Sequence, residues 1–253
     1  MLNYRIAYLN LMRYFWDGWG GFYNLSKPQK FLKLPSLKLN MDAITTKENS
    51  DINQLLTDGI QSLNLTLLPT ALQKIITYIN LINKWNKVYN LTAARTDKEL
   101  IVNHVLDSLS IAPYIKGPEI LDVGSGAGFP GIPLALALPQ YNFTLLDCLN
   151  KRTRFLNQVI IELQLKNITV IQNQIEQFHP NKYFNDIVTR ATYSISDMME
   201  KVKHLCCNST RLLMMKGKYP QQELLSITTT YTVHELQVPG LNAERNLIEI
   251  LNF

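Results

Sequence analysis

The sequence predicts an α/β fold, with a helical segment followed by an open, mostly parallel sheet of seven strands whose last strand is antiparallel. Three observations lead to this prediction. Short β-type runs alternate with helical stretches after residue 118. A turn with four glycines in eight residues follows the first of these runs. The last two runs are joined by about ten residues that include Pro239 and Gly240, which favours a hairpin.

The helical segment is predicted over residues 42–117. Within it, residues 69–89 place apolar side chains on one face at helical spacing: Leu72, Ile75, Ile76, Ile79 and Ile82. A second helix is predicted over 97–114, with Asp97 as its N-cap. Gly117 and Pro118 then end the segment.

The sheet domain is predicted over residues 118–253. Its strands are expected at residues 120–123, 142–146, 168–171, 186–189, 211–215, 231–236 and 247–251. Helical stretches between the early runs, at 129–138 and most clearly at 151–165, indicate strand-helix-strand units and therefore parallel pairing. The connection at 237–246 is too short for a crossover helix, so one antiparallel pair is expected at the end of the sheet.

Residues 1–41 form a basic, aromatic-rich leader without clear periodicity. Two interpretations stay open: a start codon assigned too early, with Met41 opening the chain, or a genuine appendage. The leader carries the whole net charge of +5, and residues 42–253 hold equal numbers of basic and acidic groups. Bulk charge is therefore weak evidence for nucleic-acid binding.

Composition excludes several classes of protein. With 253 residues and 46% apolar side chains, the chain can bury one sizeable core. No uncharged apolar stretch approaches the roughly 18 residues of a membrane helix. The cysteines Cys148, Cys206 and Cys207 lack a metal-binding spacing and are odd in number. We expect no metal, and reduced cysteines that serve in packing in a cytoplasmic protein.

The glycine turn lies in the stretch EILDVGSGAGFPGIPLALALP, and two ligands are compatible with it. Gly126, Gly128 and Gly131 match the G-x-G-x-x-G pattern of dinucleotide-binding turns. Asp122 followed by alternating glycines also looks like the first motif of methyltransferases that use S-adenosylmethionine (SAM). Either ligand needs an acid for its ribose hydroxyls, and Asp147 supplies it. The terminal hairpin favours SAM.

The residues resemble a known family beyond this motif. The stretches NKWNKVYNLTAARTDKELIVNHVLDSLSIAPYI, ILDVGSGAGFPGIPLALALP, FTLLDCLNKRTRFLNQV, IVTRA, MMKG and LQVPGLNAERNLIEI are similar to the RsmG (GidB) family, over about residues 52–251. This resemblance implies a bacterial, cytoplasmic enzyme with the class I SAM-methyltransferase (Rossmann-like) fold. It also implies methylation of N7 of a single guanine of 16S rRNA, guanine 527 in the usual rRNA numbering.

Carried over by position, the resemblance also implies the cofactor contacts. These are Gly124, Gly126 and Phe129 for the methionine end, Asp147 for the ribose, Ile175 and Glu176 for the adenosyl group, and Arg190 as a further contact. Phe129 stands where the family often has a leucine; it keeps an apolar surface, and the exchange bears on how tightly the methionine end is bound.

The chemistry predicts a site without a dominant catalytic dyad. N7 of guanine has a free lone pair and no proton, so its attack on a sulfonium methyl group needs no general base, only alignment. No Ser/His/Asp or Cys/His pattern stands out in the sequence. We expect Arg190, at a strand end, to position the substrate. His104 is expected to be a hydrogen-bonded core residue, and Trp85 and Tyr89 are expected to pack this segment onto the sheet.

Five other cations are candidates for RNA contact: Lys151, Arg152, Arg154, Lys216 and Lys218. The first three begin a helix, where positive charge opposes the helix dipole, and phosphate binding would explain their placement; an ordinary solvated face is the alternative. The expected partner is 16S rRNA, in the small ribosomal subunit or its precursor, with a monomer and no obligatory protein partner. Two other functions stay open: a SAM-dependent methyltransferase on a small molecule or protein, and a non-catalytic nucleotide-binding module.

Overall fold

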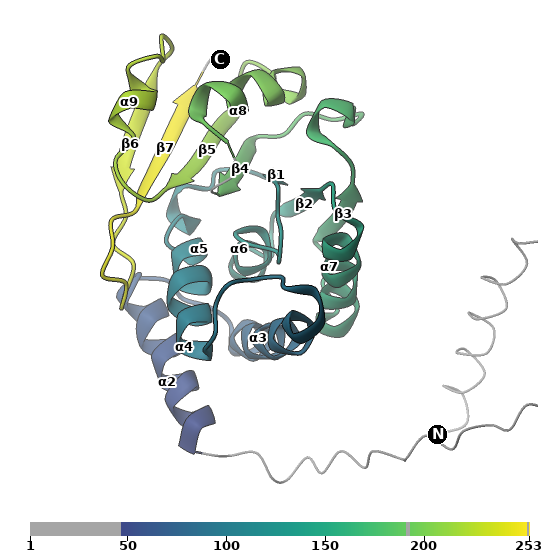
Figure 1. Cartoon of the computed structure of the whole chain (residues 1–253), viewed down its shortest axis with the longest axis vertical. Helices are drawn as coiled ribbons and strands as arrows, with labels where there is room; N and C mark the ends of the chain where they lie inside the picture. The colour runs from purple at the N-terminus through teal and green to yellow at the C-terminus, as the bar shows by residue number, and fades with distance from the viewer. Residues whose placement is uncertain (1–46, 191–192, 252) are drawn as a thin grey trace, which may run out of the picture. The chain divides into compact units, whose positions relative to one another are not determined.

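A mixed sheet of seven strands forms the centre of the structure, in the order β3-β2-β1-β4-β5-β7-β6 (Figure 1). The strands are β1 (Glu119–Val123), β2 (Asn142–Asp147), β3 (Ile168–Gln172), β4 (Asp186–Arg190), β5 (Arg211–Lys216), β6 (Tyr231–Glu235) and β7 (Asn246–Leu251). The first five are mutually parallel, and β7 runs antiparallel to both β5 and β6. The predicted seven-stranded sheet with an antiparallel last strand is confirmed.

This computed structural model describes residues 47–190, 193–251 and 253, all of which belong to the unit Ile44–Phe253. The leader at 1–41, and with it the choice between its two interpretations, lies outside the described residues. Within residues 47–190 and 193–251, no helix is both long and apolar enough to cross a membrane.

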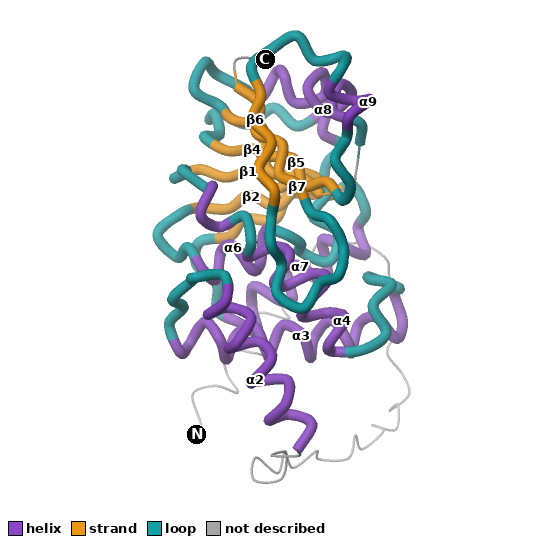
Figure 2. The backbone as a smooth tube through the Cα atoms, turned by 90° about the vertical axis from the view of Figure 1, so that its left-hand side faces the viewer, coloured by secondary structure: helices purple, strands orange, loops and turns teal. Residues whose placement is uncertain are grey.

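Helices cover both faces of the sheet (Figure 2). On one side, α6 (Gly131–Ala137) and α7 (Asn150–Leu163) lie next to the sheet, and α3 (Pro69–Tyr89) packs on the outer side of these two helices. Helix α2 (Lys47–Ser62) is on the same side, and the other side carries α8 (Ile195–Val202) and α9 (Gln221–Leu224). The sheet separates two hydrophobic cores: the first lies on the side of α6 and α7, and the second lies on the side of α8. Because neighbouring residues of a strand point to opposite faces, Ile120 packs into the first core and Leu121 into the second.

Helix α3 matches its predicted bounds. Pro69 opens it, where a missing N–H costs no hydrogen bond, and Asn90 ends it in the left-handed conformation at φ 49°. Its stripe of apolar residues faces the first core, with Ile75 and Ile82 fully buried. Helix α2 was not predicted as a separate element; Leu56 and Ile60 bury it against the same core.

The single helix predicted over 97–114 is wrong, because the structure divides it. α4 (Asp97–Leu100) continues as the π-helical segment η1 (Ile101–Leu106), then α5 (Asp107–Leu109), and the 3₁₀ turn η2 (Ala112–Tyr114) follows. Wider π-helical turns change the angular spacing of side chains and are frequent at functional sites. The Asn103 carbonyl of this segment accepts a hydrogen bond at 3.1 Å from Arg190 of β4, so the altered segment faces the sheet edge described below.

Other boundaries differ slightly from the predictions. α7 begins at Asn150 and ends at Leu163, since Gln164 adopts a left-handed conformation at φ 50°. α6 begins only at Gly131, after the cis peptide bond between Phe129 and Pro130. Two short 3₁₀ turns, η3 (Ile175–Gln177) and η4 (Lys203–Leu205), connect the later elements.

Candidate functional site

The glycine turn after β1 is held from the helical layer by Tyr78. The hydroxyl of this fully buried tyrosine donates to the Ala127 carbonyl at 2.6 Å. Gly128 has φ 101°, and a Cβ at this position would lie 2.8 Å from the Tyr78 hydroxyl oxygen. The turn therefore needs glycine here both for its backbone conformation and for the close approach of Tyr78.

Asp147, at the end of β2, anchors the same turn from the other side. Its buried carboxylate accepts hydrogen bonds from the Gly126 N–H through Oδ2 and from the Leu149 N–H through Oδ1, both at 2.9 Å. Arg152 of α7 adds an ion pair at 3.2 Å. The predicted acid thus lies directly against the predicted glycine turn.

Most N–H groups of the turn already have partners within the protein. The N–H groups of Gly124 and Ser125 donate to the Leu146 carbonyl, and those of Gly128 and Phe129 donate to the Ser125 carbonyl. Gly126 donates to Asp147 as described above. A turn that binds a pyrophosphate must offer its N–H groups to the phosphate oxygens, so this geometry favours a ligand without phosphate.

Asp122, at the start of the motif, joins the strand to the helix that follows the turn. It is fully buried in β1, and its Oδ2 accepts the Gly131 N–H at 3.0 Å, which joins the start of α6 to the sheet. Burial raises the pKa of this carboxyl group to about 7, while the hydrogen bond from Gly131 acts in the opposite direction.

A cleft of about 440 Å³ opens beside the turn at the carboxyl ends of β1 and β2. Four predicted cofactor residues line it together: Gly124, Asp147, Ile175 and Glu176. Val123 and Leu146 add apolar surface, and the volume falls within the roughly 300–1,000 Å³ typical of small-molecule sites. An apolar wall facing a buried carboxylate suits a nucleoside, whose base packs on the wall and whose ribose hydroxyls donate to Asp147.

Tyr193 and Cys148 also line this cleft. Lys201 of α8 forms an ion pair with Glu176, and its ammonium group lies 5.1 Å from the ring centre of Tyr193. Cys148 is exposed in the same cleft, so the prediction that it serves in packing is wrong. The reason is its position immediately after β2, where the chain leaves the core.

A second cleft, of about 550 Å³, lies at the carboxyl ends of β4 and β5 and is lined by Arg190, Lys216 and Arg245. Arg190, predicted as a cofactor contact, lines this cleft and is not among the residues that line the first. An ion pair of 3.1 Å with Asp107 holds it against the π-helical segment. Asp107 is buried, and its other oxygen accepts from Arg245 Nε at 2.8 Å.

His104 links this network to the loop after α3. Its Nδ1 lies 2.9 Å from Arg190 Nη2, and its Nε2 lies 2.9 Å from Thr92 Oγ1. Because a guanidinium group can only donate, Nδ1 accepts and Nε2 carries the proton. Burial, with further contributions from Arg190 and Arg245, lowers the pKa of His104 to about 4, so the ring is neutral at neutral pH.

Phe129 lies within this network instead of lining the first cleft. Its ring stacks on His104 with centres 4.9 Å apart, and the Arg190 guanidinium lies 5.2 Å from its centre. Gly126 likewise does not line either cleft, because its N–H is turned to Asp147. Phe129 and Gly126 therefore contact residues that line the clefts without lining a cleft themselves.

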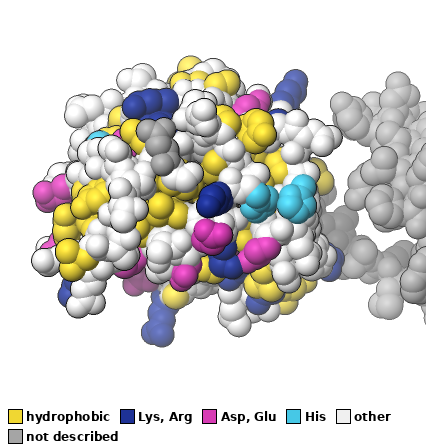
Figure 3. Space-filling model, turned by 90° about the horizontal axis from the view of Figure 1, so that it is seen from above, with side chains coloured by type: hydrophobic (Ala, Val, Ile, Leu, Met, Phe, Trp, Pro, Cys, Tyr) yellow, Lys and Arg dark blue, Asp and Glu magenta, His cyan; other side chains and the backbone are white. Residues whose placement is uncertain are grey.

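The cations predicted to contact RNA lie in different environments. Lys151 donates to the Tyr89 carbonyl at 3.3 Å, and Arg152 pairs with Asp147. Lys216 is held by Glu223 at 2.9 Å and by the Tyr193 carbonyl at 3.0 Å. Arg154 and Lys218 have exposed side chains. Figure 3, which looks onto the side of α8, shows Lys, Arg, Asp and Glu interspersed and no continuous basic patch on that face.

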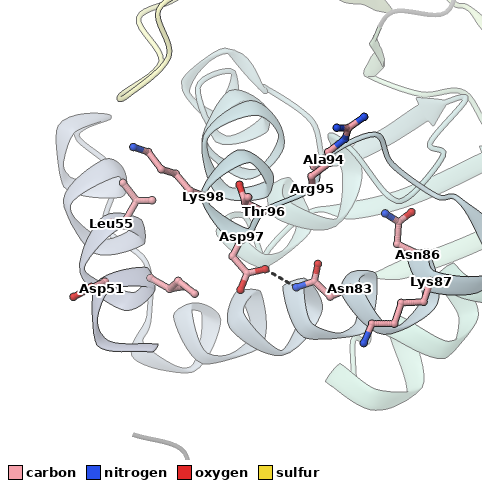
Figure 4. A pocket seen from close by; sticks show the side chains of 11 residues that line it. Asp51, Leu55, Asn83, Asn86, Lys87, Ala94, Arg95, Thr96, Asp97 and Lys98 are labelled. Atoms are coloured by element: carbon pink, nitrogen blue, oxygen red, sulfur yellow. Dashed lines mark hydrogen bonds between the residues drawn. The ribbon is translucent and has the colours of Figure 1, made fainter. Parts of the chain in front are cut away.

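Trp85 and Tyr89 are packing residues, but they pack against α7 and not onto the sheet as predicted. Their ring centres are 5.2 Å apart, and Trp85 meets Phe155 of α7 edge-on at 5.5 Å. A further cavity, of about 930 Å³, lies between α2, α3 and residues 94–98 (Figure 4). It shares no residue with the two clefts, and Asn83 and Asp97 are hydrogen-bonded across it at 2.5 Å.

Sequence reasoning missed the roles of Tyr78, Asp107 and Arg245. Each is an ordinary residue of its segment, and each acquires its task from a partner far along the chain, 49 positions away for Tyr78 and 138 for the pair of Asp107 and Arg245. The position of Asp107 one helical turn after His104 was the one signal available in the sequence.

Comparison with solved structures supports the fold. A putative O-methyltransferase from Klebsiella pneumoniae superposes with a TM-score of 0.54 at 9% identity, over 81% of this chain and 99% of that chain. A SAM-dependent methyltransferase from Aquifex aeolicus gives 0.50 at 15% identity, over 67% and 98%. At these identities the similarity concerns the fold alone, which is the predicted class I methyltransferase fold.

Comparison with families and curated proteins is more specific. The family model GidB, described as rRNA small subunit methyltransferase G, matches residues 71–248. A Coxiella burnetii protein named ribosomal RNA small subunit methyltransferase G is 45% identical over 201 residues, 79% of this chain and 98% of its own length. A Legionella pneumophila protein of the same name is 42% identical, over 81% and 97%. The chain therefore belongs to the rRNA small subunit methyltransferase G (GidB) family.

Proposed function

We propose that this protein transfers a methyl group from SAM to N7 of a single guanine of 16S rRNA, in the small ribosomal subunit or its precursor. The broader activity, that of a SAM-dependent rRNA methyltransferase, follows from the family and from relatives that carry this name. The restriction to guanine N7 rests on the chemistry of the site, developed below.

The single observation that carries the proposal is the adjacency of two clefts of different character. The first cleft combines apolar side chains with the buried carboxylate of Asp147, which is paired with Arg152, whereas the second cleft carries the three cations Arg190, Lys216 and Arg245. They open at the carboxyl ends of paired strands, β1 and β4, the edge where open α/β sheets bind ligands. One therefore suits a nucleoside cofactor and the other suits an anionic nucleic acid.

SAM is the cofactor, and we propose that the first cleft holds it. Asp147 would accept the ribose hydroxyls, Ile175 would pack on the adenine, and the turn at Gly124 would allow the amino-acid end to approach the backbone. Bound there, SAM supplies a sulfonium methyl group. Most N–H groups of the turn are already hydrogen-bonded within the protein, so they are not free to bind a pyrophosphate. This supports SAM over a dinucleotide as the ligand.

The residues at the second cleft suit an acceptor atom without a proton. His104 is neutral at neutral pH, and both its ring nitrogens are hydrogen-bonded, so it is unsuited to remove a proton. Arg190 is held on several sides and can only donate. Guanine N7 needs neither an acid nor a base, and orientation of the base provides the rate enhancement.

The deciding experiment uses methyl-labelled SAM and small subunits from cells that lack the modification. Chemical strand scission at N7-methylguanine then maps the label. The proposal requires label at one guanine of 16S rRNA. Label on other atoms or other molecules would support a small-molecule or protein substrate instead.

A thermal-shift series separates the cofactor hypotheses. A ligand that binds only the native state raises the melting temperature by mass action. SAM and S-adenosylhomocysteine should stabilise the protein, and NAD should not. Stabilisation by NAD alone would support the nucleotide-binding module. We further propose that the protein acts as a cytoplasmic monomer, since its substrate is cytoplasmic and the two clefts are built from one chain.

A further inference from the structure

We propose that the RNA strand crosses the protein at Gly217, so that the target guanine occupies the second cleft and the adjacent nucleotide occupies a third cavity beyond it. Arg245 and Lys218 would hold the phosphate between the two nucleotides. This inference rests on the proposed function and adds to it the path of the substrate strand.

The third cavity measures about 790 Å³ and lies along the connection between β6 and β7. It shares Gly217, Leu241 and Arg245 with the second cleft. Because these three residues line both cavities, the cavities adjoin at Gly217. In the proposed path a single-stranded segment crosses from one cavity to the other at this point, with one base on each side.

Gly217 lies at this crossing point and has no side chain to obstruct it. It is exposed, it follows β5 directly, and a Cβ built on it would have Arg245 Nη1 as its nearest neighbour, 3.9 Å away. A larger side chain would therefore find space without strain, and it would stand between the two cavities. The Asn246 side chain donates to the Gly217 carbonyl at 2.9 Å, which fixes the backbone here.

Arg245 is oriented in advance for a phosphate. Its Nε donates to Asp107 at 2.8 Å and its Nη1 donates to the Glu244 carbonyl at 2.8 Å. Among the described residues no acceptor binds its Nη2, which remains for a ligand on the shared wall. A guanidinium group fixed by two internal bonds loses little entropy when it binds an oxyanion. Lys218 has an exposed side chain and adds a second charge at the same place.

The third cavity itself suits a base better than a phosphate. Glu235 and Glu244 line it, and their charges would repel phosphate oxygens. Carboxylates do accept hydrogen bonds from base amino groups. Leu236, Val238 and Leu241 supply apolar surface on which a base can pack. The charge pattern thus places the backbone at Arg245 and Lys218 and the base inside.

The test compares four variants with the wild-type protein: Gly217→Ala, Gly217→Leu, Lys218→Gln and Lys166→Gln. Lys166 is an equally exposed lysine between α7 and β3, so its variant controls for charge loss. Methylation of small subunits is measured at limiting RNA. The affinity for unmethylated 16S rRNA fragments is measured over a range of salt concentrations, and SAM affinity by calorimetry.

The expected result is a graded loss at Gly217. The alanine variant should retain most activity, and the leucine variant should lose about tenfold or more in kcat/KM for RNA. Lys218→Gln should weaken RNA binding several-fold and reduce the slope of log affinity against log salt by about 1, while Lys166→Gln leaves both unchanged. SAM affinity should be the same in all four, which also shows that they fold.

Wild-type rates and salt slopes for both Gly217→Leu and Lys218→Gln would overturn the proposed path. The outcome is separable from the proposed function because RNA binding is read without methylation. If the wild type did not methylate 16S rRNA but these two variants still weakened RNA binding, the path would stand and the proposed reaction would fail.

Discussion

The Asp107 carboxylate lies 3.1 Å from the guanidinium of Arg190, 83 positions later in the chain. The same carboxylate accepts from Arg245, so one buried group fixes two of the cations that line the second cleft. Asp107 comes from the segment just after the π-helical turns, and its side chain is 3% exposed. This arrangement makes Asp107 a positioning residue for both arginines.

Replacement of Asp107 by asparagine should therefore destabilise the protein and impair its use of RNA. Removing one partner of a buried ion pair costs about 3 kcal/mol, because the remaining charges lose their compensation. Urea unfolding should show this loss, and methylation of small subunits should fall. SAM affinity should change little, since Asp147 lies in the other cleft. The exposed Asp58→Asn variant is the control, and equal stability of the two variants would contradict the prediction.

Replacement of Asp147 by asparagine should weaken SAM binding by at least about tenfold, or about 1.4 kcal/mol. The amide NH₂ group would face N–H donors of Gly126, Leu149 or Arg152 that now meet carboxylate oxygens. Isothermal titration calorimetry measures the affinity, and thermal unfolding without ligand separates a local effect from a loss of the fold. An unchanged affinity would exclude Asp147 from the cofactor site.

Tyr78→Phe tests whether the helical layer holds the glycine turn. Burial raises the pKa of Tyr78 well above its usual value, so the hydroxyl is a proton donor throughout the neutral range. Its loss leaves the Ala127 carbonyl without a partner in the interior, at a cost of roughly 1–3 kcal/mol. Both unfolding free energy and SAM affinity should fall. The matched control is Tyr183→Phe at an exposed position; equal behaviour of the two would show that the turn stands without Tyr78.

The pH dependence of stability should contain a contribution from His104. Its pKa in the folded protein is about 4, below the ordinary value of 6.5, so the unfolded chain binds the proton more tightly. Stability is therefore fully present above about pH 6.5 and is lost as the pH falls toward 4. Allowing for partial exposure of the ring, the loss is on the order of 2 kcal/mol.

Urea unfolding of the wild type and of His104→Gln between pH 7.5 and 4.5 checks this contribution. Glutamine does not titrate in this range, so its curve should be flatter, with the two curves separating at high pH and converging at low pH. Parallel curves over the whole range would show that His104 titrates normally in the folded protein.

The sequence predicted those elements whose signals are local. The apolar run 120–123, the four glycines that follow it and the hairpin at Pro239 and Gly240 each occupy a few neighbouring residues, and backbone sterics decide their conformation. Strand-helix alternation then restricts the connections to a parallel sheet. Helix α3 was predicted with its bounds because its apolar stripe and its Pro69 are equally local.

The continuous helix over 97–114 failed for the opposite reason. Its apolar periodicity is compatible with both α- and π-helical turns, and the choice between them involves a contact between the Asn103 carbonyl and Arg190 on β4. No pattern within the segment contains that contact.

The sequence by itself determined the fold class, the family and the cofactor, because these depend on composition and on the spacing of motifs along the chain. Only the tertiary structure decided which groups meet: that Asp147 binds the turn, that Asp107 holds Arg190 and Arg245, and that Arg190 lines the second cleft. An ion pair depends on distances in space, and the sequence around a carboxylate does not show which arginine will lie beside it in the folded protein.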